Sequence, residues 1–233
     1  MLNKTAIVLI AFLIFTSSAL ADNEIYIDQT GSNATININQ DGSSNRVGAT
    51  GDISTSDGST TTMDIDQVGS SNVLDYNIYG TNADVTSNTQ GSSSDIGINI
   101  GTTGGSNGGS DDVSVTLNNT GDSNTVDVNV GTATSVTTDD VDIDIDITGD
   151  SNTVTVTENS TAASISDKLT DIDITGSTNT VTASKSGSAQ HDTTINHTGS
   201  SSTISVTQSG AEASTVSATT DGSSSNITIT VTD

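Results

Sequence analysis

The sequence contains no cysteine, no proline and no tryptophan. The lack of cysteine excludes a disulfide framework and any thiolate metal site. The lack of proline leaves every backbone amide able to donate a hydrogen bond, as the central strands of a sheet require. Aromatic residues are scarce too, since Phe12 and Phe15 lie near the start and only Tyr26, Tyr76 and Tyr79 follow. We therefore do not expect a thick globular core.

Basic residues are rare as well, with 4 Lys and Arg against 29 Asp and Glu. One of the four is Lys4, so the chain beyond residue 21 carries a net charge of 3 − 29 = −26. Such a chain repels nucleic acid, anionic lipid and its own copies unless salt or divalent cations screen the charge. Low hydrophobicity with high net charge is also typical of disorder, so a disordered acidic secreted chain is one alternative.

Residues 1–21 have the pattern of a secretory signal peptide. Lys4 precedes an apolar run over residues 6–15, and Ala19 and Ala21 provide the small side chains expected before a cleavage site. The run is too short for a membrane-spanning helix, and no later run is long enough. We therefore expect a secreted protein without a membrane span, whose mature part is one β-repeat domain over residues 22–233.

A strict alternation of β-branched residues with Asp, Asn, Ser and Thr distinguishes this chain from a disordered one. Alternation with a period of two predicts strands that have one apolar face. The clearest runs cover residues 25–29, 36–40, 113–117, 126–130, 141–147, 154–156, 172–174 and 204–206. Because turn residues bound each run, the pattern predicts an all-β protein.

The turns share a glycine that is followed by asparagine. Gly42, Gly69, Gly121, Gly149 and Gly176 each precede, by three residues, Asn45, Asn72, Asn124, Asn152 and Asn179, and Gly31 precedes Asn33 by two. Further glycines stand at 91, 199 and 222, and successive turn glycines are 11 to 30 residues apart. Repetition with a period in the low twenties is typical of a solenoid.

Parity around each turn predicts which side chains point inward. Around Gly121, the inward set is Val115, Leu117 and Asn119 before the turn and Asn124 after it. One strand-turn-strand unit cannot bury its narrow apolar face alone, but stacking units about 4.8 Å apart pairs every backbone group with its neighbours. The expected fold is a β-solenoid, with ladders of Asn and Gln amides along the stack.

These repeats resemble the curlin repeat of curli amyloid fibre subunits, in which Gln, Gly and Asn recur in the order Gln-x-Gly-x-x-Asn. Residues 25–45 and 65–72 carry the likeness best, with Gln29, Gln40 and Gln67 two residues before a glycine. Later in the chain this position holds Asn119, Ile147, Ile174, His197 and Thr220. The Gln ladder is therefore expected to be incomplete.

The resemblance implies a secreted subunit that polymerises with copies of itself into extracellular fibres for biofilm matrix and adhesion. It also implies a nucleator subunit, a periplasmic chaperone and an outer-membrane export pore as partners. The alternative is a secreted β-solenoid that does not polymerise, such as an adhesin stalk or a calcium- or ice-binding module.

Few residues suggest chemistry. Asp142, Asp144 and Asp146 are expected to point outward together, and neighbouring carboxylates can collect Ca²⁺, although a solvated acidic strand is the commoner explanation. His191 and His197 lack a third ligand for zinc. Because no Ser or Asp is tied to an activating His by a known motif, we do not expect an enzyme.

Two further sequence patterns stand apart from the repeat. Threonine alternates with other residues over 153–157, 180–182 and 228–232. Aligned threonines bind ice in some proteins, but threonine also simply suits an exposed strand. Residues 101–112 are rich in Gly and Ser and are expected to form a loop or a hinge between two stacks.

Overall fold

The computed structural model describes residues 22–30, 33–42, 44–48, 54–57, 60–79, 82–101, 112–131, 140–159, 168–187, 190–210 and 214–232. The expected signal peptide lies outside the described residues. Those that are described form strands and turns, with no helix among them. None of them belongs to a helix long and apolar enough to cross a membrane.

The strands form two parallel sheets. The eleven-stranded sheet contains β1 Asp22–Ile25, β2 Asp28–Thr30, β4 Ser44–Val47, β5 Ser54–Asp57, β7 Val73–Tyr79, β9 Asp95–Ile100, β11 Thr125–Val130, β13 Thr153–Asn159, β15 Thr180–Ser186, β17 Thr203–Ser209 and β19 Asn226–Thr232. The eight-stranded sheet contains β3 Asn33–Asp41, β6 Thr60–Val68, β8 Asn82–Gln90, β10 Asp112–Thr120, β12 Val141–Thr148, β14 Lys168–Thr175, β16 His191–Thr198 and β18 Thr215–Asp221.

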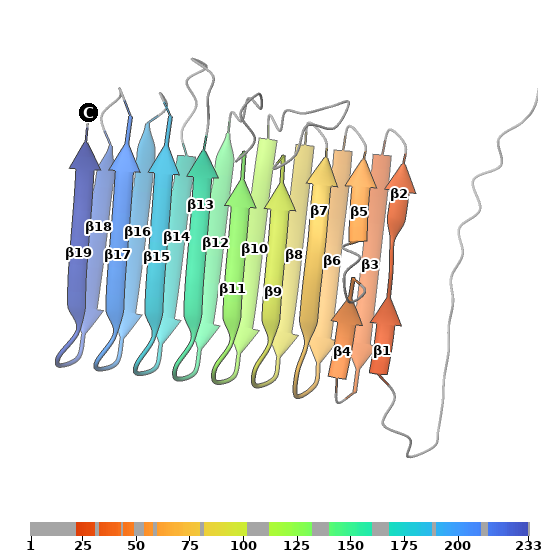
Figure 1. Cartoon of the computed structure of the whole chain (residues 1–233), viewed down its shortest axis with the longest axis horizontal. Coiled ribbons are helices and arrows are strands. Elements are labelled where there is room, and N and C mark those ends of the chain that lie inside the picture. The colour runs from red at the N-terminus through yellow and green to blue at the C-terminus, as the bar shows by residue number, and fades with distance from the viewer. Residues whose placement is uncertain are drawn as a thin grey trace, which may run out of the picture.

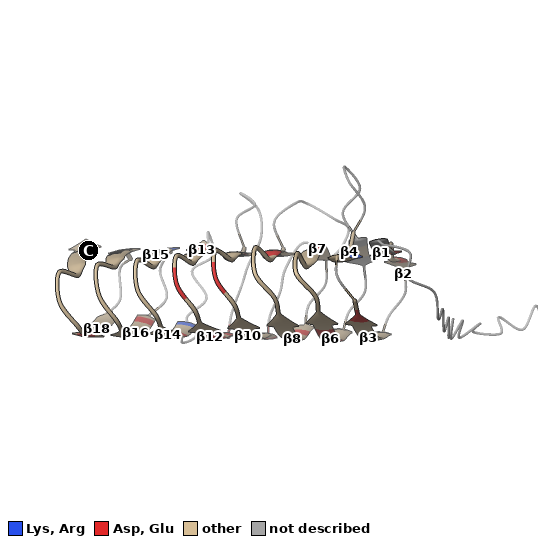
Figure 2. Cartoon of the chain, turned by 90° about the horizontal axis from the view of Figure 1, so that it is seen from below, with Lys and Arg blue, Asp and Glu red and all other residues tan. Residues whose placement is uncertain are grey.

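The chain alternates between the two sheets as it advances along the stack. A strand of the eight-stranded sheet, its glycine turn and the next strand of the eleven-stranded sheet make one unit, here called a rung. Rungs pair in parallel register, as where β10 lies between β8 and β12 and β11 lies between β9 and β13. Figures 1 and 2 show the two sheets as two straight layers facing each other. The predicted all-β solenoid is confirmed.

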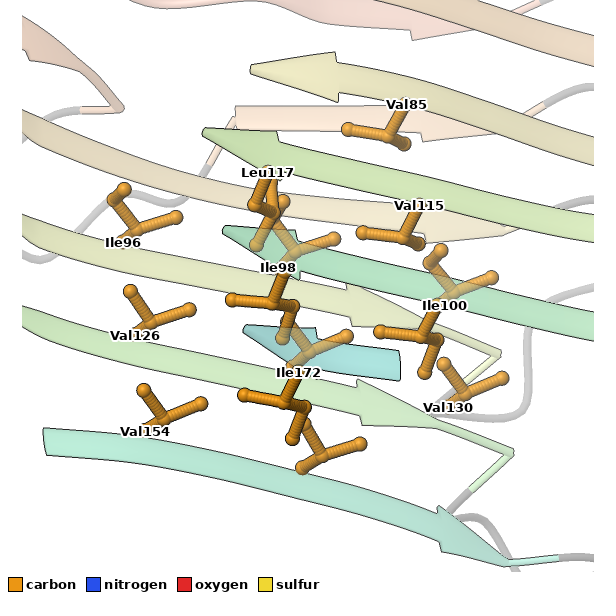
Figure 3. Packing of buried hydrophobic residues seen from close by; sticks show 14 of the residues in the cluster. Val85, Ile96, Ile98, Ile100, Val115, Leu117, Val126, Val130, Val154 and Ile172 are labelled. Atoms are coloured by element: carbon orange, nitrogen blue, oxygen red, sulfur yellow. The ribbon is translucent and has the colours of Figure 1, made fainter. Parts of the chain in front are cut away.

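The core is the thin space between the layers. On β12, Val141, Ile143, Ile145 and Ile147 are buried, whereas the residues that alternate with them are exposed. Valine, isoleucine and leucine from both sheets meet there in continuous columns (Figure 3). Each fully buried side chain of this kind contributes about 1.5–3 kcal/mol, so the stack is stabilised by many small aliphatic groups and no large aromatic cluster is needed.

The strands on either side of the segment 101–112 pair directly. Residues 102–111 of that segment lie outside the described residues. Across it, β8 pairs with β10 and β9 pairs with β11, so both sheets are continuous. The described strands therefore form one stack.

Candidate functional site: ladders, faces and ends of the stack

The turn glycines lie directly above one another. A Cβ atom built on Gly121 would lie 1.9 Å from the carbonyl oxygen of Gly91, and one on Gly149 would lie 2.1 Å from that of Gly121. Gly121 and Gly149 also have φ values of +146° and +143°, which L side chains rarely adopt. Glycine is thus required both by the turn and by the close approach of the neighbouring rung.

The turn asparagines form a ladder along the stack. The Oδ1 atom of Asn124 accepts from the backbone N–H of Ser94 at 2.7 Å. Asn152 accepts in the same way from Asn124 at 2.8 Å, and Asn179 from Asn152 at 2.7 Å. Each asparagine thereby satisfies a buried backbone amide of the preceding rung, which fixes the phase of the turns. Nearer the N-terminus, the side-chain amides of Asn45 and Asn72 donate to the carbonyls of Val68 and Gln90 at 2.8 and 3.2 Å.

The glutamine ladder is short, as expected. Gln40 and Gln67 are partners across β3 and β6, and the Gln67 side chain donates to Oε1 of Gln40 at 2.9 Å. In later rungs the same buried position holds Asn119, Ile147 and Ile174. His197 follows, with Nε2 2.7 Å from the Ser202 hydroxyl. The position thus remains inward while its chemistry changes.

Two residues of the first repeat lie elsewhere than predicted. Gln29 is on β2 of the eleven-stranded sheet opposite Ser56, so it is not in the column of Gln40 and Gln67. Asn33 begins β3, pairs with Thr60 and is exposed, so it is not a turn asparagine. Gly31 itself lies outside the described residues. The sequence signal was the distance of 11 residues between Gly31 and Gly42, which is only about half the spacing of the other turn glycines.

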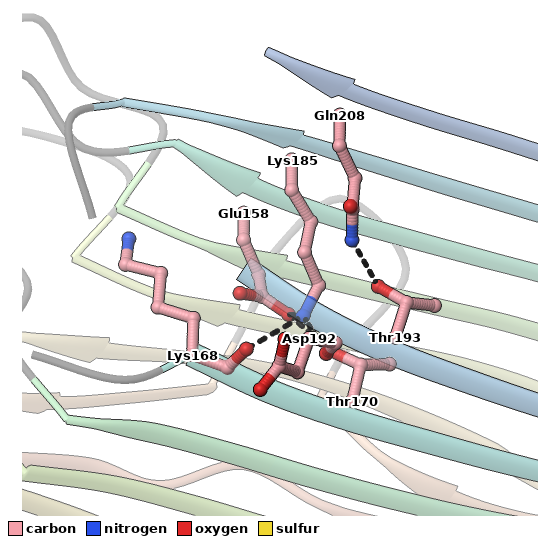
Figure 4. A network of polar contacts seen from close by, with 7 residues as sticks. All are labelled: Glu158, Lys168, Thr170, Lys185, Asp192, Thr193 and Gln208. Carbon is pink, nitrogen blue, oxygen red and sulfur yellow. Dashed lines mark hydrogen bonds and ion pairs between the residues drawn. The ribbon is translucent and has the colours of Figure 1, made fainter. Parts of the chain in front are cut away.

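The interior contains a charged cluster that the sequence did not predict (Figure 4). The Lys185 ammonium lies 3.3 Å from Oε1 of Glu158, and both side chains are 0% exposed. Lys185 also donates to the backbone carbonyls of Lys168 and Asp192, at 3.1 and 2.9 Å. Thr170 donates its hydroxyl to Glu158. Burial lowers the pKa of Lys185, whereas the Glu158 carboxylate opposes that shift.

His191 lies in the column of this cluster. It pairs with Lys168 across β14 and β16 and is fully buried. Burial, with added repulsion from Lys168 and Lys185, lowers the pKa of His191 to about 4. The imidazole is therefore neutral at neutral pH. Inward parity at Lys168 and Lys185, two of the three basic residues after residue 21, was the sequence signal for this cluster.

The outer face of the eight-stranded sheet is acidic. Asp142, Asp144 and Asp146 are exposed on β12, as predicted, and Asp171 and Asp173 continue their rows on β14. Partial burial, and then repulsion from neighbouring aspartates, raises the pKa of Asp144 and of Asp171. Within the described ranges, no group of three or more His, Cys, Asp or Glu is arranged to hold a metal ion.

Among the described residues, both ends of the stack lack a further strand. Strands β18 and β19 end the two sheets, and each has a sheet partner on one side only in the described part of the chain. Ile227, Ile229 and Val231 of β19 are 38–46% exposed, whereas Ile204 and Val206 one rung earlier are 0% exposed. At the other end, Ile25, Ile27 and Ile36 are only partly buried. Apolar side chains that are interior elsewhere therefore face solvent at the ends.

The arrangement thus offers two kinds of surface, the ends of the stack and the outer faces of its sheets. Comparisons with family models, with curated proteins and with solved structures find no match for this chain.

Proposed function

We propose that this chain is a secreted structural subunit whose copies stack end to end into extracellular amyloid-like fibres of the curli type, serving biofilm matrix and surface adhesion. The observation that carries the proposal is the open end at β18 and β19, where an apolar rung is left without a cover. Unpaired strand edges template further pairing, and soluble proteins normally block them. The resemblance to curlin repeats supports the same function.

The first and last strands of the eleven-stranded sheet are complementary in register. Following the pairs along the eleven-stranded sheet, Ile25 begins and Ile227 ends a single aliphatic column. In the eight-stranded sheet, the column that begins at Ile36 and ends at Val216 is apolar except for Thr170 and Thr193. If β1 of the next copy pairs with β19 in this register, Ile25 of that copy covers Ile227 and the aliphatic column of the eleven-stranded sheet continues from copy to copy. The eight-stranded sheet has one strand fewer than the path from β1 to β19, so β3 of the next copy then lies two strand spacings, about 9.6 Å, from β18.

Charge opposes this contact. Asp41 and Asp221 begin and end one column of the eight-stranded sheet, so the same stacking brings these two carboxylates to the junction, about 9.6 Å apart. Salt or Ca²⁺ screens such a pair, and assembly is therefore expected to accelerate as either is raised. The partners that the resemblance implies, a nucleator subunit, a periplasmic chaperone and an outer-membrane pore, would control when and where this occurs.

Electron microscopy of the purified mature chain, residues 22–233, after incubation in salt tests the proposal. Fibres that are rich in β-structure and bind amyloid dyes are expected. A monodisperse monomer that persists at high ionic strength would contradict it, and would favour the non-polymerising binding module.

Cross-linking tests the register separately, because the chain has no cysteine of its own. Thr228→Cys in one copy and Tyr26→Cys in another are expected to form a disulfide within fibres, since in-register neighbours lie about 4.8 Å apart. The control pairs Thr228→Cys with Asp28→Cys, which the same register separates by about 8 Å. Equal cross-linking of both pairs would refute the register while leaving fibre formation intact.

A further inference from the structure

Part of one outer face of the stack consists of small neutral polar residues. It is formed by the last four strands of the eleven-stranded sheet, β13, β15, β17 and β19, and is here called the threonine face. Its outward residues are Thr153, Thr155, Thr157, Asn159, Thr180, Thr182, Ser184, Ser186, Thr203, Ser205, Thr207, Ser209, Asn226, Thr228, Thr230 and Thr232. The threonine runs of the sequence, separate along the chain, are thus contiguous in the fold.

The threonine face carries no charge, although the chain is strongly acidic. On the same rungs, the opposite face bears Asp142, Asp144, Asp171 and Asp173. Earlier strands of its own sheet carry outward acids too, among them Asp127 on β11. These outward acidic residues therefore lie away from the threonine face.

The hydroxyl groups lie on a regular grid. The four strands pair in parallel register without a shift, so equivalent residues such as Thr155, Thr182 and Ser205 form straight rows. Rows repeat about every 4.8 Å across strands and about every 6.6 Å along them. Figures 1 and 2 show that these strands stay straight and lie side by side. Branching at Cβ also restricts each threonine side chain to few rotamers.

The composition of this face excludes most classes of partner. It has no cation or anion for a charged ligand and no aromatic ring for stacking on a sugar. A dry protein interface would bury many hydroxyl groups, each of which needs a hydrogen-bond partner. Water satisfies every hydroxyl, because the hydroxyl both donates and accepts. A rigid grid of hydroxyl and methyl groups is suited to a partner that is itself a regular array of water molecules.

We infer that the threonine face binds ice. The hydroxyl groups hold the first layer of water molecules in rows whose spacings are similar to the distances between oxygen atoms at an ice surface. The methyl groups limit competing hydration, and the missing charges avoid strongly held, misoriented water. This function is independent of stacking through the ends, and a monomer and a fibre would both show it.

The test is inhibition of ice recrystallisation by the monomeric mature chain in low salt, with thermal hysteresis as a second readout. Thr182→Lys, at an inner position of the grid, is expected to abolish both activities. The matched control is Thr194→Lys, the same change on the outer face of β16, which is expected to leave both unchanged. Circular dichroism checks that the two variants retain the β-structure of the wild type.

Ser205→Lys, one strand along the same row, provides a second test if Thr182→Lys does not fold. The inference is overturned if the wild type neither inhibits recrystallisation nor shows hysteresis, or if the changes at Thr182 and Thr194 have equal effects. Because the assay uses monomer, its outcome is separate from that of the fibre experiment.

Discussion

The interior of the stack has different chemistry in two neighbouring regions, at the strand ends farthest from the glycine turns. On β9 and β11 this position is occupied by Ile100 and Val130, which lie in register with each other. The same column continues with Glu158 on β13 and Lys185 on β15. Both sets are fully buried. In-register stacking places each side chain against its equivalents, so an aliphatic residue needs aliphatic neighbours and a charged one needs an opposite charge next to it.

The largest expected effect comes from breaking the charged region on one side. Glu158→Ala leaves the Lys185 ammonium buried without its counter-ion, and removing one partner of a buried pair costs about 3–5 kcal/mol. Val130→Ala in the aliphatic region removes only methyl groups and is expected to cost about 2 kcal/mol. Urea unfolding of the two variants measures the difference. Equal losses would mean that Glu158 contributes packing alone.

The second largest expected effect is a pH dependence of stability that arises from His191 in the charged region. The pKa of His191 is about 4 in the folded chain, below its ordinary value of 6.5, so the unfolded state takes up the proton first as pH falls. Stability is therefore fully present above pH 6.5 and declines between 6.5 and 4, by about 2–3 kcal/mol. His191→Val, which copies Val141 two rungs earlier in this column, is expected to remove that decline.

The aspartates of the acidic face also make stability depend on pH, so their contribution has to be distinguished from that of His191. Burial and like-charge repulsion raise the pKa of Asp144 and Asp171, so these groups bind protons more readily in the folded state and stabilise it as pH falls. They are present in both proteins, and the difference between wild type and His191→Val isolates the imidazole. Parallel pH profiles for the two proteins would contradict the assignment.

The asparagine ladder runs through both regions, and removing one of its side chains is expected to reduce stability by a smaller amount. Asn152→Ala removes the acceptor for the buried N–H of Asn124, and an unsatisfied buried donor costs about 1–3 kcal/mol. Thr153→Ala changes the neighbouring exposed residue and is expected to alter stability by less than about 0.5 kcal/mol. Thermal unfolding of both variants is the measurement. A loss of similar size for both would show that the ladder does not stabilise the stack.

The sequence was sufficient to predict the features that repeat within each rung. The alternation of Ile143 and Ile145 with Asp144, and the turn from Gly149 to Asn152, depend on local parity and on backbone geometry. The meeting of Glu158 with Lys185 depends instead on which residues of different rungs lie side by side. Connections of unequal length separate the rungs, so their alignment is not fixed by parity alone. For the same reason Gln29, half a repeat out of phase, was grouped with Gln40 and Gln67 but lies in the other sheet.

The smallest expected effect comes from converting the charged region into the aliphatic one. Glu158→Val combined with Lys185→Val removes both charges and extends the column of Ile100 and Val130. Replacing a whole buried ion pair by apolar residues is often neutral or stabilising, in contrast to removing one partner. The Thr170 hydroxyl then loses its acceptor, which offsets part of any gain. We expect urea unfolding to place the double variant within about 1 kcal/mol of the wild type. A loss as large as that of Glu158→Ala would mean that this region needs the charges themselves, because they hold β13 and β15 in register.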